Sequence, residues 1–230
     1  QYSVSGINQR IIDLKILYVE LDASIYFNES FVSTVSSLQS EILNQLIEYS
    51  KSTNFNKFGG RFKYSKLLNV IDEVDRKAIT SNITNIKIRR DLKASINKLA
   101  QYELCFGNEF HVKSEGLNIK STGFKVFGET STVYFTDIPN KDGKSGILQI
   151  VKLLENDKTK IVKSSAGKID YTKGEIIVDT VNIVSTNKKD NIIEIEAVPE
   201  SNDVVGLKDL YLSLDVSKSR INMLRDLISS

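Results

Sequence analysis

The sequence LYVELDASIYF at residues 17–27 decides how the first part of this chain folds. Apolar residues occupy its odd-numbered positions, whereas the even-numbered positions are polar or tyrosine. A period of two places alternate side chains on opposite faces of an extended backbone. We therefore predict a half-buried strand here, or a pair of strands in a hairpin, with an apolar face that other elements must cover.

Two helices are predicted after this strand. In the first, which begins near Ser33 and Thr34, apolar side chains recur every three or four positions, and the two hydroxyls can cap unpaired N–H groups. A second such pattern covers residues 64–74, with Ser65 as its expected cap. The alternation returns at residues 86–89, so the predicted order is strand, helix, helix, strand.

The remainder of the chain has a different pattern. From about residue 103 the helical period is lost, and short apolar runs alternate with Gly, Asn, Asp and Lys, which is typical of strands joined by turns. The sequence IDYTKGEIIV predicts a hairpin with Gly174 in its turn. We expect an α+β fold in which residues 1–100 form a small strand-helix-helix-strand module and residues 101–230 form a β-rich domain.

Composition excludes several classes of protein. The 31 basic and 29 acidic residues nearly cancel, which argues against a dedicated nucleic-acid binder. The single cysteine, Cys105, excludes an internal disulfide, and together with the single histidine, His111, it does not make a structural zinc site. We expect both to be structural side chains, with Cys105 buried. No signal peptide or long apolar run is visible, and because the chain begins at Gln1 we expect a fragment of a longer protein or a processed one.

The sequence FGGRFKYS at residues 58–65 raises the question of a phosphate-binding loop. Its spacing matches neither G-x-x-x-x-G-K-[ST] nor G-x-G-x-x-G, so this function is disfavoured. A turn between the two helices, with positive φ at Gly59 and Gly60, is the favoured interpretation. In this interpretation Phe58 and Phe62 flank the turn and anchor it in the core.

Two charged clusters have alternative interpretations. Asp72, Glu73 and Asp75 would need a pocket and shifted pKa values for acid–base chemistry, and the helical pattern places them on the solvent side. The segment at residues 87–93 contains Lys87, Arg89, Arg90 and Lys93, and a basic strand can bind phosphates. It lacks interleaved aromatic residues, so surface salt bridges or an acidic partner protein are favoured. With no catalytic constellation in the sequence, we expect no enzyme activity, no metal and no cofactor.

The order of several segments resembles the baseplate J-like family. These segments are ILYVELDASIYFNES, NKFGGRFKYSKLLNVIDEVD, SNITNIKIRRDL, GKIDYTKGEIIV and LYLSLDVSKSRINMLRD. Within that family the sequence is most similar to the inner-ring wedge proteins of T-even-type contractile-tailed phages. The resemblance covers most of the chain, is poorest over residues 103–165, and identifies the chain with the carboxy-terminal part of such proteins, without their long amino-terminal part.

The resemblance implies structural work rather than catalysis. Members of the family occur as paired copies in each wedge, join a continuous ring around the tail tube and contact other wedge proteins. It implies a late virion protein of the tail baseplate, assembled in the host cytoplasm, whose partners are itself and other wedge proteins. Nucleic acid, membranes and small-molecule substrates are not among the expected partners.

In this interpretation the glycine turn reaches a neighbouring subunit. Aromatic residues and arginine are enriched at the cores of protein interfaces, and both surround the two glycines. The candidate interface residues are Phe58, Gly59, Gly60, Arg61, Phe62, Lys63, Tyr64, Arg89 and Arg90.

A β-rich receptor- or glycan-binding module of a tail-associated protein is the alternative function. It predicts an exposed aromatic platform, for which Phe127, Tyr134 and Phe135 are candidates, although positions in strand cores explain them equally well. A J-like subunit of another contractile injection machine is a further alternative. The long second half and the LDVSKSRINMLRD segment favour the phage baseplate.

Overall fold

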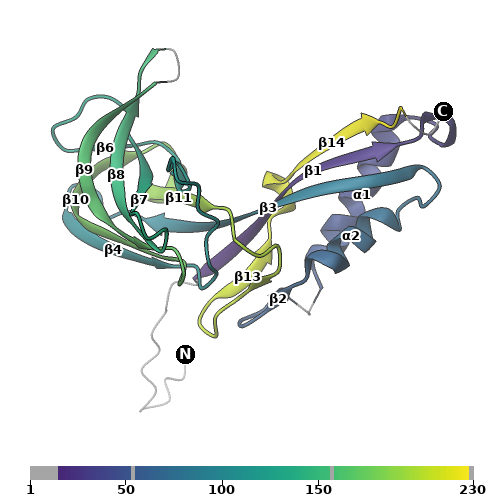
Figure 1. The fold of residues 1–230 in the computed structure, drawn as a ribbon, viewed down its shortest axis with the longest axis horizontal. Helices are drawn as coiled ribbons and strands as arrows, with labels where there is room; N and C mark the ends of the chain where they lie inside the picture. Colours follow the sequence, from purple (N-terminus) through teal and green to yellow (C-terminus); the bar gives the residue numbers. More distant parts are fainter. Residues whose placement is uncertain (1–14, 53–54, 156–157, 228–230) are drawn as a thin grey trace, which may run out of the picture.

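The computed structural model describes residues 15–52, 55–155 and 158–227 (Figure 1). The chain is mixed but dominated by strands, and the β-rich second part fits this architecture. Within the described residues there are two α-helices, α1 (Val35–Ser50) and α2 (Tyr64–Asp72).

The strand at the start of the chain is a single element. β1 (Ile16–Phe27) runs without a hairpin turn, and its odd-numbered side chains are buried, which confirms the alternation. β3 (Ile79–Lys93) follows the helices. The expected strand-helix-helix-strand module fits only loosely, because the short strand β2 (Arg61–Phe62) lies between the two helices.

The first sheet is built around β1 and β3, which pair antiparallel along the length of β1. Beyond β3 lie β11 (Ile192–Ala197) and then β5 (Lys120–Ser121). The other edge of β1 is covered by β13 (Tyr211–Leu214) and β14 (Arg220–Arg225), which run parallel to it one after the other. The first sheet therefore joins strands from the beginning, middle and end of the chain (Figure 1).

The second sheet contains most of the remaining strands. Its order is β4 (Leu99–Cys105), β10 (Glu175–Thr186), β9 (Thr159–Asp170), β8 (Ser145–Leu153) and β7 (Tyr134–Pro139), and β6 (Phe124–Val126) also pairs with β10. β12 (Val204–Val205) pairs with β2. The hairpin of β9 and β10 is confirmed, and Gly174 in its turn has a φ of +64°.

The two helices lie beside the first sheet and are capped differently. Thr34 caps α1 as expected, because its side chain accepts a hydrogen bond from a first-turn N–H. For α2 the predicted Ser65 cap is wrong, since the N-cap is Lys63 and the Tyr64 N–H donates to Asp203 Oδ1 at 2.8 Å. A carboxylate at a helix N-terminus is favourable, but this one lies 139 residues away in sequence.

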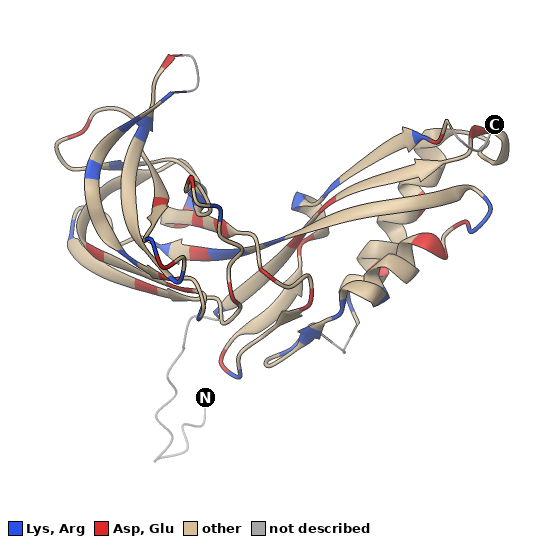
Figure 2. Cartoon of the chain, viewed as in Figure 1, with Lys and Arg blue, Asp and Glu red and all other residues tan. Residues whose placement is uncertain are grey.

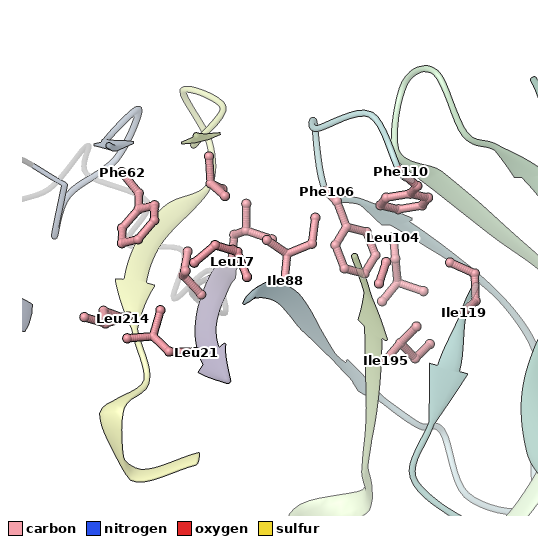
Figure 3. Close-up of a cluster of buried hydrophobic side chains, with 14 of the residues drawn as sticks. Leu17, Leu21, Phe62, Ile88, Leu104, Phe106, Phe110, Ile119, Ile195 and Leu214 are labelled. Atoms are coloured by element: carbon pink, nitrogen blue, oxygen red, sulfur yellow. The ribbon is translucent and has the colours of Figure 1, made fainter. Parts of the chain in front are cut away.

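Buried apolar side chains continue from the first sheet to the second. Figure 3 shows Leu17, Ile88 and Phe106 in one continuous row, and they belong to one cluster of buried residues. That cluster extends across the boundary expected near residue 101. The division into residues 1–100 and 101–230 stays a prediction, and strands from the second part return to pair with β1 and β3.

The edge of β1 has a break where β13 ends and β14 begins. The short 3-10 segment η4 (Val216–Lys218) fills the gap. Ser219 Oγ accepts from the Leu21 N–H at 3.0 Å and donates to the Asp215 carbonyl at 2.7 Å. The Asp215 N–H donates in turn to the Val19 carbonyl at 2.9 Å. These hydrogen bonds replace the interrupted ladder, so that the Val19 carbonyl and the Leu21 N–H of β1 keep hydrogen-bond partners at the break.

We predict that Ser219→Ala lowers the free energy of unfolding by about 1–3 kcal/mol. The variant removes the hydroxyl that accepts from the Leu21 N–H, and a partly buried N–H without an acceptor is costly. Urea denaturation followed by circular dichroism measures this change. Ser217→Ala is the matched control, since Ser217 is exposed in the same segment and donates only to Asp215 Oδ1. Equal losses in the two variants would contradict the assigned role of Ser219.

Candidate interface

The glycine turn depends on close approach of backbone segments. Gly59 has the predicted positive φ, at +62°, and its N–H donates to the Leu207 carbonyl at 3.1 Å. Gly60 does not share the positive φ that we expected, but a Cβ on it would lie 2.0 Å from the carbonyl oxygen of Phe55. Both positions therefore require glycine, one for its backbone conformation and the other for space.

Beyond the turn, β2 and β12 form a two-stranded ribbon. Phe62 and Val204 are paired in register and buried, whereas Arg61 and Val205 are paired in register and exposed. Successive side chains of a strand point to opposite faces, so Arg61 and Val205 share the outer face of this ribbon.

The outer side of the ribbon and its turn forms a continuous candidate surface, which we call the ribbon surface. Its members are exposed to solvent and are Phe58, Arg61, Lys63, Val205 and Leu207. Phe58 is 52% exposed, although one edge of its ring packs against Tyr211 at a centroid distance of 5.4 Å. Among the described residues, no carboxylate forms an ion pair with Arg61 or Lys63. An aromatic ring beside arginine and aliphatic side chains is a composition enriched at interface cores.

The expected interface residues of the turn differ in how far they are exposed to solvent. Phe62 is confirmed as a core anchor, since it is 1% exposed and contacts Phe55 edge to face. The same expectation is wrong for Phe58, which stays half exposed. Tyr64 is half-buried, and its hydroxyl donates to the Thr84 carbonyl at 2.8 Å.

The surface position expected for Arg89 is wrong. Arg89 is 2% exposed, and its guanidinium donates to Glu20 Oε1, Asp91 Oδ1 and, at 2.8 Å, Asp215 Oδ2. The ring of Tyr18 lies 4.0 Å from its central carbon, which adds a cation–π contact. Arg89 thus binds β1, β3 and the link between β13 and β14, and Figure 2 shows acidic and basic segments adjoining in this central region.

Burial and neighbouring charges act in opposite directions on these groups. Burial lowers the pKa of Arg89, but hydrogen bonding to Glu20 and the charge of Asp91 outweigh it and raise the net pKa. Burial raises the pKa of Glu20 even with Arg89 beside it. Burial also acts to raise the pKa of Glu194, but the Lys218 ammonium reverses the effect and the net pKa is lowered. The shifts thus favour the charged forms of Arg89 and Glu194, whereas burial acts against the charge of Glu20.

Arg90 is also buried, at 7% exposure, so its expected surface position is wrong too. It donates to the carbonyl of Cys105 and thereby links β3 to β4, while burial lowers its pKa. Cys105 itself is half-buried rather than fully buried. His111 is exposed, and its Nδ1 lies 2.8 Å from Glu200 Oε2.

The carboxylates at the end of α2 have local partners. Asp75 accepts from the N–H of Ala78, and Glu73 pairs with Arg76 at 2.9 Å. In the part of the chain that the structure describes, no group of three or more His, Cys, Asp and Glu side chains is placed to hold a metal. None of the described helices combines the length and apolar character needed to cross a bilayer.

The exposed aromatic platform expected for a glycan-binding module is not formed. Phe127 is 79% exposed, but Phe135 is 1% exposed and packs on Phe124 with ring centroids 4.5 Å apart. Tyr134 is half-buried. The three rings therefore do not offer one shared surface.

Sequence reasoning missed the partners that fix the ribbon in place. The Asn108 amide donates to the Val205 carbonyl and accepts from the Val205 N–H, both at 2.9 Å, in the manner of a β-bridge. A Cβ at Gly107 would lie 2.5 Å from Leu207 Cγ. These contacts join segments 97 residues apart, and no local pattern indicates them.

Comparison with known proteins identifies a related family. Residues 15–91 match the family of the baseplate structural protein gp6, C-terminal domain III. The matched segment includes β1, the glycine turn, both helices and most of β3. A search of curated proteins found no match. The family match supports a phage baseplate family and a structural role.

We predict that Arg89→Met lowers the free energy of unfolding by about 3–5 kcal/mol, because it leaves Glu20 buried without a counter-charge. Adding Glu20→Gln to this variant is expected to recover more than about 1 kcal/mol in a double-mutant cycle measured by urea denaturation. Arg76→Met is the control, since that arginine forms an exposed pair, and it is expected to give a much smaller loss. Strict additivity of the two buried substitutions would show that the pair is not coupled.

We also predict different effects at the two glycines of the turn. Gly60→Ala places a methyl group against the Phe55 carbonyl and is expected to cost about 1–3 kcal/mol of stability. In Gly59→Ala the new methyl group lies 4.0 Å from Lys208 Cα, an ordinary contact, but alanine must adopt the positive φ, so the cost is expected to be about 1 kcal/mol. Thermal and urea unfolding of both variants tests this order, and a larger loss for Gly59→Ala would contradict it.

Proposed function

We propose that this chain is a structural subunit of a phage tail baseplate wedge, which forms part of the inner ring around the tail tube. The match of residues 15–91 to a baseplate structural domain carries the proposal. That family is structural, which favours a role without catalysis. In this proposal the chain resides in the tail baseplate of the virion and is assembled there from the host cytoplasm.

The proposed partners are other copies of this chain and other wedge proteins. The finer assignment, to the J-like inner-ring proteins, rests on the order of segments that resembles that family. A small net charge of +2 permits identical copies to approach one another closely. Nucleic acid, membranes and small-molecule substrates are not proposed as partners.

We assign the contact with a neighbouring subunit to the ribbon surface. Phe58, Val205 and Leu207 supply apolar area, and since each is already about half buried, covering the rest of one such side chain contributes on the order of 1 kcal/mol. Arg61 and Lys63 flank this area with cations that have no internal ion pair among the described residues.

The ribbon surface is also held rigid before any contact forms. Gly59 is bound to Leu207 and Asn108 is bound to Val205, so the backbone under the exposed side chains is fixed. A preorganised surface loses little conformational entropy on association. This rigidity suits a subunit that must place its neighbour in a defined orientation.

We predict that association of the purified chain weakens about tenfold or more in Phe58→Asp and in Arg61→Glu. The first variant buries a charge in the contact, and the second reverses a charge beside it. Light scattering after size exclusion, across a concentration series, measures the association, and unfolding curves establish that both variants remain folded.

Phe127→Asp is the matched control, because Phe127 is 79% exposed but lies outside the ribbon surface. Equal weakening in this control would contradict the assignment of the contact. A wild-type chain that stays monomeric at every concentration would contradict self-association of this chain and leave only contacts with other wedge proteins.

A further inference from the structure

A hollow lies on one face of the first sheet, where β3, β11 and β5 adjoin. Glu196 on β11 pairs with Lys120 on β5 along one edge and with Arg89 on β3 along the other. Lys87 lies two residues before Arg89 on β3. Lys87, Glu196 and Lys120 therefore share one face of the sheet. The loop at residues 111–118 forms the remaining wall, and the hollow has a volume of about 460 Å³ including its open mouth.

The apolar lining of this hollow is exposed and partly strained. Leu117 is 56% exposed and Val198 is 43% exposed, and both line the hollow. Leu117 has a φ of +61°, a conformation that leucine rarely adopts. The loop is held in place because Asn118 binds both the N–H and the carbonyl of Lys113 through its side chain. The fold thus sustains an unfavourable backbone conformation at a leucine whose side chain remains largely in solvent, and such outliers point to function.

The charged rim of the hollow is unbalanced. Lys87, Lys113 and Lys120 line it with a single carboxylate, that of Glu196. Within the described residues, none of these three lysines lies at ion-pair distance from a carboxylate. Elsewhere on the same sheet the pattern differs, since Lys218 and Lys188 both pair with Glu194.

We infer that this hollow binds an acidic segment of another protein chain, with an aliphatic or aromatic side chain of that segment seated on Leu117 and Val198. Carboxylates on either side of this anchor side chain form ion pairs with the lysines of the rim. A lysine ammonium group can bind a carboxylate from many directions, so the pairing needs no fixed geometry. The anchor side chain buries the exposed apolar surface of Leu117 and Val198, which a simple anion would leave in contact with water. The inference goes beyond the proposed function and rests on the shape, apolar lining and charge of the hollow.

The experiment titrates the full chain with the capped peptide Glu-Glu-Phe-Leu-Glu-Glu by isothermal calorimetry. The double variant Lys87→Glu with Lys120→Glu is expected to weaken binding at least about tenfold. The control is Lys158→Glu with Lys160→Glu, which makes the same change in net charge at exposed positions far along the sequence. Absence of binding to the wild type, or equal weakening in the control, would overturn the inference.

A second variant separates binding from folding. Leu117→Asn introduces a residue type that tolerates positive φ, so the melting temperature is expected to stay the same or rise, while peptide binding is expected to weaken at least about fivefold. The peptide Glu-Glu-Ser-Ser-Glu-Glu is expected to bind the wild type more weakly than the parent peptide by a similar factor. If the variant binds as well as the wild type, or the serine peptide as well as the parent, the hollow recognises charge only and the assigned ligand is wrong.

Discussion

The buried guanidinium of Arg89 is the interaction on which the rest of this structure depends. It binds carboxylates from β1, from β3 and from the link between β13 and β14, and the last of these lies 126 residues away in sequence. Neither the cation nor its partners can be buried alone without a large desolvation cost. One charge cluster therefore fixes β1, β3 and the link between β13 and β14 relative to one another, beside the break in the ladder of β1.

β3 connects this cluster to both surfaces considered above. Its buried side chains complete the core under the helices and beside the second sheet, whereas Lys87, two residues from Arg89, lines the basic hollow. The ribbon surface is attached to the same frame through Tyr64, whose hydroxyl binds the carbonyl of Thr84 on β3. β3 thus connects the two surfaces for which we propose contacts with other chains, and residues 15–91, which include most of β3, match a baseplate structural domain.

Local patterns predicted the elements whose causes are local. The alternation of β1, the Thr34 cap and the hairpin at Gly174 depend on residues close in sequence, and all three are confirmed. Local patterns placed Arg89 at the surface, because its burial depends on Glu20 and on Asp215, which are distant in sequence. The cap of α2 and the Asn108 bridge escaped prediction for the same reason. Sequence patterns therefore pointed to the turn at residues 58–63 as part of the ribbon surface. That Val205 on β12 and Leu207 after it lie beside this turn is visible only in the tertiary structure.

The parallel pairing of β13 and β14 along β1 has a consequence for the order of folding. β1 is made before the other described strands, but its outer edge pairs with β13 and β14, which are the last of them. During synthesis that edge therefore stays open until residues 211–225 have left the ribosome. Contacts of such long sequence separation make folding slow, and an unpaired edge invites pairing with the wrong chain. β13 and β14 thus complete the first sheet only after the strands of the second sheet have been made.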